Sequence, residues 1–188
     1  MPELLDFRMK RVFMDYFKKN DFIENDKVGF RLYHPTKDMI CSNFTKEDWI
    51  MIFVDVDEHL LTEWADYYID RVVLMAVDMH TGKSFGFICI QESHEKPLYV
   101  WFHGGVWNHN MKGQLLGFEA ADLILHFLVD NHMTVFVTCY KWNNKANRFL
   151  NSLGFVDYCY DERLAYKKLT KEHLDSNILR KRTSNRIK

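Results

Sequence analysis

The sequence has no long apolar run, no paired-cysteine motif and no excess of charge of either sign. Its 188 residues include 25 Lys or Arg and 26 Asp or Glu, a formal net charge of −1. Such a balance gives no overall attraction to nucleic acid or to an acidic membrane surface. No apolar stretch approaches the ~20 residues that a membrane-spanning helix needs. We therefore expect no membrane association, and no nucleic-acid binding driven by overall charge.

The few cysteines give no sign of a disulfide framework or a zinc site. Cys41, Cys89, Cys139 and Cys159 each stand singly, inside or beside an apolar run, and no Cys-x-x-Cys pair is present. The first residues, Met-Pro-Glu-Leu-Leu-Asp, carry acids where a secretory signal peptide has basic residues. These features predict reduced core thiols in a cytoplasmic protein.

Apolar residues are plentiful, at 47% of the chain, so a single domain with a substantial core is expected. We place a folded domain at residues 28–169, preceded by an amphipathic helix and linker at 1–27. A basic tail follows at 170–188, and its last ten residues hold five basic side chains and no acid. Such a tail fits a fraying end, with contact to nucleic acid or acidic lipid as the alternative.

Within the first segment, residues 3–19 carry apolar side chains at helical spacing. The apolar stripe consists of Leu5, Met9, Val12, Phe13, Tyr16 and Phe17. A helix of this kind must bury its stripe, either on the main domain or on a second subunit. A homodimer is therefore one of two expected arrangements.

An acidic stretch occupies residues 45–70, with eight Asp or Glu against the single lysine Lys46. It has the spacing of two helices, at 45–53 and 57–70. The run is explained by a solvated helix face, or by an acidic rim that attracts a cationic substrate. The spacing around Asp55 and His59 matches neither an EF-hand nor a His-Glu-x-x-His site, so no metal is expected.

The most informative stretch is 98–131. The apolar run Leu98–Phe102 predicts a buried strand, and a glycine hinge follows at Gly104-Gly105. A long apolar-periodic helix begins near Lys112-Gly113 and Gly117. Backbone N–H groups at a helix start, beside glycine and a lysine, form an anion-binding device. The same pattern also fits a plain strand–loop–helix connection.

The expected element order is strand, two helices, three strands joined by hairpins, helix, strand, helix and two strands. The predicted strands are 28–33, 71–79, 84–91, 98–102, 133–140, 155–160 and 164–169. A mixed α/β (α+β) fold follows, with helices flanking a mostly antiparallel sheet of about six to seven strands.

This order, together with two motifs, resembles the GNAT N-acetyltransferase superfamily over residues 28–169. One motif is Asn143-x-x-Ala146, followed by Leu150 and by Gly154-Phe155. The other is Lys112-Gly-Gln-Leu-Leu-Gly117, which is similar to the family's phosphate loop. The resemblance implies a sheet that splays apart between its fourth and fifth strands.

The resemblance further implies that acetyl-CoA, with no metal, binds in this splay near Gly104-Gly105. The pantetheine arm would pair with the fourth strand, the helix start would hold the pyrophosphate, and the Asn143 side chain would touch the arm. The implied cofactor-binding residues are Val106, Trp107, Lys112, Gly113, Gln114, Leu115, Leu116, Gly117, Asn143 and Ala146.

The implied reaction moves an acetyl group to a primary amine of a cationic small molecule or a protein. The predicted fourth strand carries no Asp or Glu, so His103 is the first candidate base and Glu92 the second. Tyr140 is the candidate proton donor to the thiolate. A histidine hydrogen-bonded inside the sheet is the alternative explanation for His103.

Three positions depart from the family pattern. Lys112 stands for the usual arginine or glutamine, Leu115 for a glycine, and Leu150 for a frequent tyrosine. These departures keep a second function class open, a catalytically inactive GNAT-fold module that serves in binding or structure.

Overall fold

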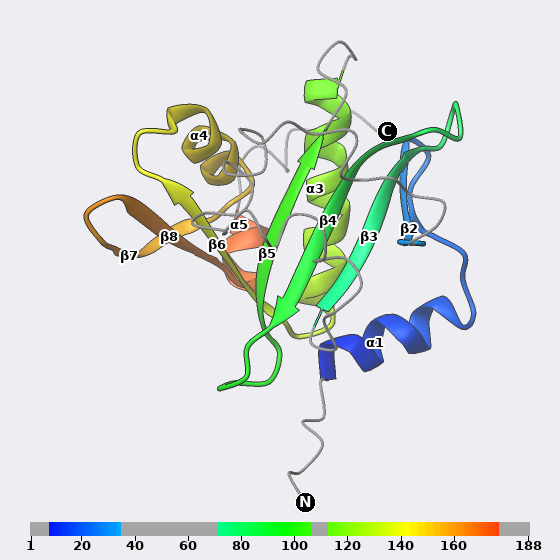
Figure 1. Cartoon of the computed structure of the whole chain (residues 1–188), viewed down its shortest axis with the longest axis horizontal. Helices are drawn as coiled ribbons and strands as arrows, with labels where there is room; N and C mark the ends of the chain where they lie inside the picture. The colour runs from blue at the N-terminus through cyan, green and yellow to red at the C-terminus, as the bar shows by residue number, and fades with distance from the viewer. Residues whose placement is uncertain (1–7, 35–70, 107–112, 177–188) are drawn as a thin grey trace, which may run out of the picture.

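The computed structural model, drawn in Figure 1, describes residues 8–34, 71–106 and 113–176. Its described strands form one sheet in the order β1-β2-β3-β4-β5-β6-β8-β7. The strands are β1 Ile23–Glu24, β2 Val28–Leu32, β3 Arg71–Asp78, β4 Ser84–Glu92, β5 Tyr99–Val106, β6 Thr134–Tyr140, β7 Val156–Tyr160 and β8 Leu164–Leu169. Every neighbouring pair is antiparallel except β5 and β6, which are parallel. The expected mixed, mostly antiparallel sheet is confirmed, with eight strands in place of six to seven.

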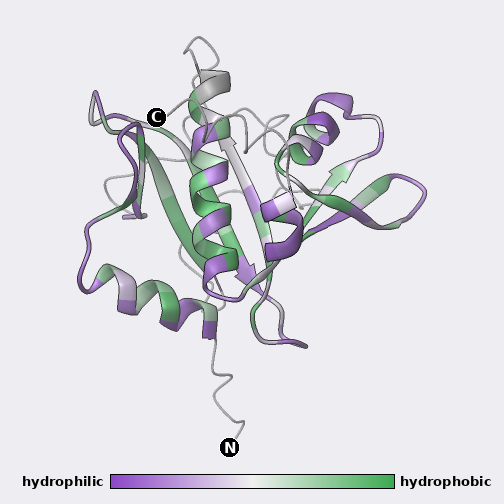
Figure 2. Ribbon diagram, turned by 180° about the vertical axis from the view of Figure 1, so that it is seen from behind, coloured by the Kyte–Doolittle hydropathy of each residue, from purple (hydrophilic) through white to green (hydrophobic). Residues whose placement is uncertain are grey.

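The described helices pack on one face of this sheet and bury a core there. The described helices are α1 Arg8–Phe17, α3 Gly113–Asp130, α4 Asn144–Ser152 and α5 Lys171–Ser176. Figure 2, seen from behind, shows α3 crossing the sheet on the face turned toward the viewer. Met9 and Phe13 of α1 and Leu174 of α5 are fully buried in the same core as α3. Met9 and Phe13 of the predicted stripe are therefore covered within this chain, and Val12, Tyr16 and Phe17 are partly buried against the same core.

The turn between β3 and β4 forms as its residues predict. The Asp78 carboxylate accepts the His80 N–H at 2.9 Å and the Thr81 hydroxyl at 2.8 Å. The hydroxyl holds the pKa of Asp78 below its ordinary value. Gly82 has φ +69°, the left-handed conformation that glycine adopts without steric cost. This turn fixes the register of β3 on β4.

The sheet splays between β5 and β6. β5 pairs with β4 over its length, from Val100 opposite Glu92 to Val106 opposite Gly86. Its parallel pairing with β6 ends after three positions, the last being Trp101 opposite Phe136. Beyond Trp101 the β6-facing edge of β5 has no strand partner among the described residues. The splay lies where it was expected, between the predicted fourth and fifth strands. These two strands are numbered β5 and β6 because the short β1 comes before them.

The expected hinge at Gly104-Gly105 is not present, because β5 continues through both glycines to Val106. Gly104 lies directly against β4. A Cβ atom there would stand 2.8 Å from the Phe87 carbonyl oxygen and 2.9 Å from Ile88 Cγ2. The glycine serves close strand packing and not a bend.

Several boundaries differ from the sequence expectations. β1 is a two-residue strand that was not predicted, and α5 forms inside the segment assigned to the basic tail. Cys89 and Cys139 are buried free thiols, as expected, but Cys159 is exposed because β7 is an edge strand. None of the described helices is long and apolar enough to cross a bilayer.

Some predicted features lie outside the described residues. These are the helices at 45–53 and 57–70 with their acidic side chains, residues 1–7 of the first helix, the basic residues 179–188, Cys41, and the cofactor candidates Trp107 and Lys112.

Candidate active site

Two helices meet above the splay. Phe118 of α3 and Phe149 of α4 contact edge to face, with ring centroids 6.3 Å apart. Asn147 joins α4 to the end of β6, because its Nδ2 donates to the Tyr140 carbonyl at 3.0 Å and its Oδ1 accepts the Cys139 thiol proton at 3.3 Å. α3 and α4 are thereby held over the gap where β5 and β6 diverge.

The Asn143 motif builds the start and end of α4. The Asn143 side-chain oxygen accepts the Ala146 N–H at 3.1 Å, which caps the helix. Gly154, with φ +95°, ends the helix as expected. Leu150 is 9% exposed and belongs to the core. The motif therefore positions α4, and the oxygen of Asn143 is already used in doing so.

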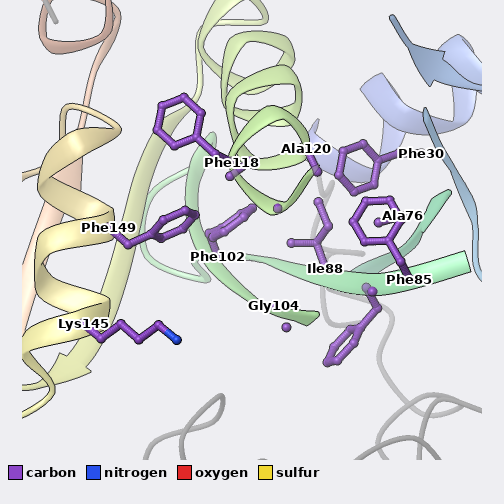
Figure 3. Close-up of a pocket in the computed structure, with 15 residues that line it drawn as sticks. Phe30, Ala76, Phe85, Ile88, Phe102, Gly104, Phe118, Ala120, Lys145 and Phe149 are labelled. Carbon is purple, nitrogen blue, oxygen red and sulfur yellow. The ribbon is translucent and has the colours of Figure 1, made fainter. Parts of the chain in front are cut away.

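A cavity of about 510 Å³ lies between these two helices and the sheet. Its lining is aromatic, aliphatic or glycine apart from Lys145 (Figure 3). At one end stand Lys145 and Phe149 of α4, both exposed, and Gly117 of the first turns of α3. We call this the outer end. At the other end stand Phe30 of β2 and Phe85 of β4, both buried.

The outer end is suited to an anion. Lys145 is the one charged side chain among the described residues that line the cavity, and no ion pair of Lys145 occurs in the described parts of the chain. α3 begins at Gly113, and the first N–H groups of a helix have no intrahelical partner. The positive end of the helix dipole lies at this start, four residues before Gly117, which lines the cavity. An anionic group linked to an apolar arm fits this arrangement.

The structure brings some of the sequence-predicted cofactor residues to this cavity. Gly117 lines it, and Gly113, Gln114 and Leu115 form the first turn of α3. Val106 is the last residue of β5. Leu116 and Ala146 pack against the core.

Sequence reasoning missed Lys145 and Phe149, both at the outer end of the cavity. Lys145 stands between Asn143 and Ala146 in the motif itself. The signal that could have identified Lys145 is a cationic side chain in the first turn of α4, the helix that follows β6 at the splay.

His103 lies across the sheet from the cavity. Phe102 and Gly104 line the cavity, and side chains alternate along a strand, so His103 points to the opposite face. Tyr99 and Trp101 share that face with it. Tyr140, at the end of β6, stacks on Trp142 with ring centroids 5.2 Å apart. The two candidates therefore lie on strands that diverge, with His103 past the last paired position.

Glu92 is engaged in the fold. Its side chain is buried, at 2% exposed. One oxygen accepts the Met9 N–H at 3.0 Å and the other accepts the Leu98 N–H at 2.7 Å. The first contact connects the end of β4 to the start of α1. The second holds Leu98, which has φ +64° and directly precedes β5. Glu92 lies at the end of β4 away from Gly86, and its role as a base stays a prediction.

Aromatic rings gather on the face that carries His103. Phe136 contacts Tyr99 at 5.3 Å, Trp101 at 5.4 Å and Tyr158 at 5.6 Å between ring centroids. Lys96 donates to the Tyr99 hydroxyl at 2.6 Å and thereby lowers the pKa of Tyr99. This aromatic face offers stacking and apolar contact on the side of the sheet opposite the cavity.

The residues that the structure describes contain no group of three His, Cys, Asp or Glu side chains that could hold a metal ion. The acidic stretch at 45–70 lies outside them.

No family model matches the chain, and no curated protein sequence matches it. Solved structures do. The chain is similar to FdhC, a nucleotide-linked sugar GNAT, with 16% identity, a TM-score of 0.65 and coverage of 86% of this chain and 97% of that one. It is similar to RimJ of Mycobacterium smegmatis in complex with CoA-disulfide, with 14% identity, a TM-score of 0.62 and coverage of 84% and 88%.

A third similar structure is the ribosomal-protein-S5-alanine acetyltransferase of Vibrio fischeri, with 14% identity, a TM-score of 0.59 and coverage of 81% and 98%. At such identities the likeness concerns the fold. The chain has the GNAT fold, with its mixed sheet splayed at the parallel pair β5–β6.

Proposed function

We propose that this protein is an acyl-CoA-dependent N-acyltransferase, which moves an acyl group, acetyl in the simplest case, from CoA to a primary amine. The observation that carries the proposal is the cavity at the splay, with Lys145 and the start of α3 at one end and an apolar interior. The GNAT fold supports it, and one similar structure holds a CoA-derived ligand.

The donor fits the cavity by its chemistry. The pyrophosphate would lie at the first turn of α3, from Gly113 to Gly117, with Lys145 and Lys112 supplying positive charge. The pantetheine arm would run along β5, whose edge beyond Trp101 has no strand partner in the described structure. That edge offers main-chain hydrogen bonds of the kind an added strand receives.

The reaction needs one nucleophile and two proton transfers. The acceptor amine attacks the thioester carbonyl, the C–N bond forms and the C–S bond breaks. The amine proton passes to a base, and the departing thiolate, whose ordinary pKa is ~8.5, takes a proton to become the free thiol of CoA. The products are an amide and CoA.

We assign the acceptor to the aromatic face, with His103 as the base. An imidazole of ordinary pKa ~6.5 is suited to accept a proton near neutral pH. His103 follows Trp101 on the same face, so an amine held by the aromatic rings reaches it from the side opposite the cavity. Tyr140, at the end of the diverging β6, is assigned as the proton donor to the thiolate.

One observation favours the second candidate function, an inactive GNAT-fold binding module. Leu150 stands where the resemblance expects a tyrosine, and it is buried in the core, away from solvent. α4 then supplies no hydroxyl at that position, so activity rests on a donor from another element.

The test is a transfer assay with acetyl-CoA and a panel of amines, including polyamines, amino sugars and peptides with free N-termini. Release of CoA thiol and the mass of the amide are followed. Lys145→Glu should weaken CoA binding at least tenfold, whereas Arg148→Glu, the same charge change on the same helix but outside the cavity lining, should weaken it less than threefold. Equal effects of both variants would remove Lys145 from the donor site. CoA binding without transfer to any amine would favour the inactive module.

A further inference from the structure

The cavity is deeper than an acetyl group requires. From the outer end at Lys145 it extends to an inner end whose residues Phe30, Ala76 and Phe85 are buried, at 1%, 4% and 2% exposed (Figure 3). These three residues lie on β2, β3 and β4, so the cavity extends from β5 at the splay across three further strands.

Small residues leave this space open. The lining carries Ala76 and Gly86 on the sheet side and Ala120 and Ala121 on the α3 side. Larger apolar residues surround them, and the described lining away from Lys145 holds no charged side chain. A space with such an apolar lining accepts an apolar ligand and gives no partner to a polar one.

The length of the cavity sets the size of that ligand. Neighbouring strands lie ~4.8 Å apart, so β2 and β5 are separated by about 14 Å. An extended alkyl chain advances about 1.3 Å per carbon, because C–C bonds of ~1.5 Å meet at tetrahedral angles. By these spacings, a span of this length has room for a chain of roughly ten to eleven carbons.

We propose that the donor is a medium-chain acyl-CoA whose acyl chain occupies the inner end of this cavity, between α3 and strands β2 to β4. The inference rests on the proposed function, because the outer end must hold the CoA part. The transfer is the same in its bonds: the amine forms an amide with the medium-chain acyl group, and CoA leaves as the free thiol.

The test is a chain-length series of CoA thioesters, titrated calorimetrically into the full chain. Each buried methylene strengthens binding by up to about fourfold. Octanoyl-CoA should therefore bind at least tenfold more tightly than acetyl-CoA, with the gain ending between eight and twelve carbons. Equal affinity for acetyl-CoA and octanoyl-CoA would overturn the inference and leave the proposed function standing. Failure of CoA and of every thioester to bind would overturn both.

Two variants localise the acyl chain. Ala76→Leu fills the inner end from β3 and should bring the ratio of octanoyl-CoA to acetyl-CoA affinities below about threefold. Ala120→Leu fills it from α3 and serves if the first variant melts much below wild type. Lys145→Glu is the matched control, since it should weaken both thioesters by the same factor and keep the wild-type ratio. A ratio that stays at the wild-type value in both filling variants would place the chain elsewhere and refute the assignment.

Discussion

Substitution of Glu92 by glutamine tests whether this carboxylate is a structural cap or a catalytic base. The side chain is 2% exposed and accepts two backbone N–H groups, one from α1 and one at the start of β5. Glutamine keeps one acceptor oxygen but turns an NH₂ group toward the other N–H. One buried donor then loses its partner, at a cost of ~1–3 kcal/mol, and the remaining bond loses its charge assistance, about 1 kcal/mol.

Together these losses predict that Glu92→Gln lowers the free energy of unfolding by about 2–4 kcal/mol, which for a chain of this size lowers Tm by about 5–15 °C. Chemical denaturation and thermal melting measure both quantities. Glu95→Gln is the matched control, because Glu95 is exposed in the turn that follows β4, and it should change stability by less than about 0.5 kcal/mol.

The same variant separates structure from catalysis. Below its melting range, folded Glu92→Gln should keep acyl transfer within about threefold of wild type, because its carboxylate is occupied by two N–H groups. A variant as stable as wild type would refute the capping argument. A fall in turnover by the ~10²-fold or more expected for a lost general base would move the catalytic role from His103 to Glu92.

Three further predictions follow from single contacts. Gly104→Ala should destabilise the protein by about 2 kcal/mol or more in denaturant unfolding, because its methyl group meets the Phe87 carbonyl; unchanged stability would show that β4 gives way. The Lys167 ammonium, which is 2% exposed and 2.5 Å from the Asp157 carboxylate, lowers the pKa of Asp157. The pair therefore stabilises the fold fully above the ordinary pKa of 3.8, and this stability is lost as pH falls through the lowered pKa. The stability gap between wild type and Asp157→Asn should therefore close as pH falls below 3.8. His103→Ala should reduce turnover at least ~10²-fold without weakening CoA binding, and the pH–rate profile should lose its ascending limb near neutrality; turnover within about threefold of wild type would exclude His103 as the base.

Much of the fold could be predicted because its signals are local. The β3–β4 hairpin follows from apolar runs on both sides of a turn with glycine at a left-handed position. The long α3 and the capped α4 follow from helical spacing and from Asn143 and Gly154. By contrast, β1 has two residues and no measurable period, and it forms because Ile23 pairs with Phe30. Pairing with the neighbouring strand determines such a short strand, and the sequence of the strand alone does not predict it.

The site was only partly predictable because its parts meet through tertiary packing. Gly104-Gly105 was assigned as a hinge, but the contact that requires glycine is with Phe87 and Ile88, on a different strand. Glu92 is an ordinary glutamate in the sequence and becomes a buried cap only where α1 and β5 meet β4. The inner end of the cavity is made of Phe30, Ala76 and Phe85, which no spacing in the sequence connects.

Calorimetric titration of purified protein with CoA and acetyl-CoA tests the central claim most directly, because every step of the proposed reaction requires the donor to bind at the splay. The account predicts one binding site per chain. Its affinity for CoA should fall at least tenfold in Lys145→Glu and less than threefold in Arg148→Glu. Absence of binding of both ligands at millimolar concentration, in protein shown to be folded by its melting transition, would contradict it.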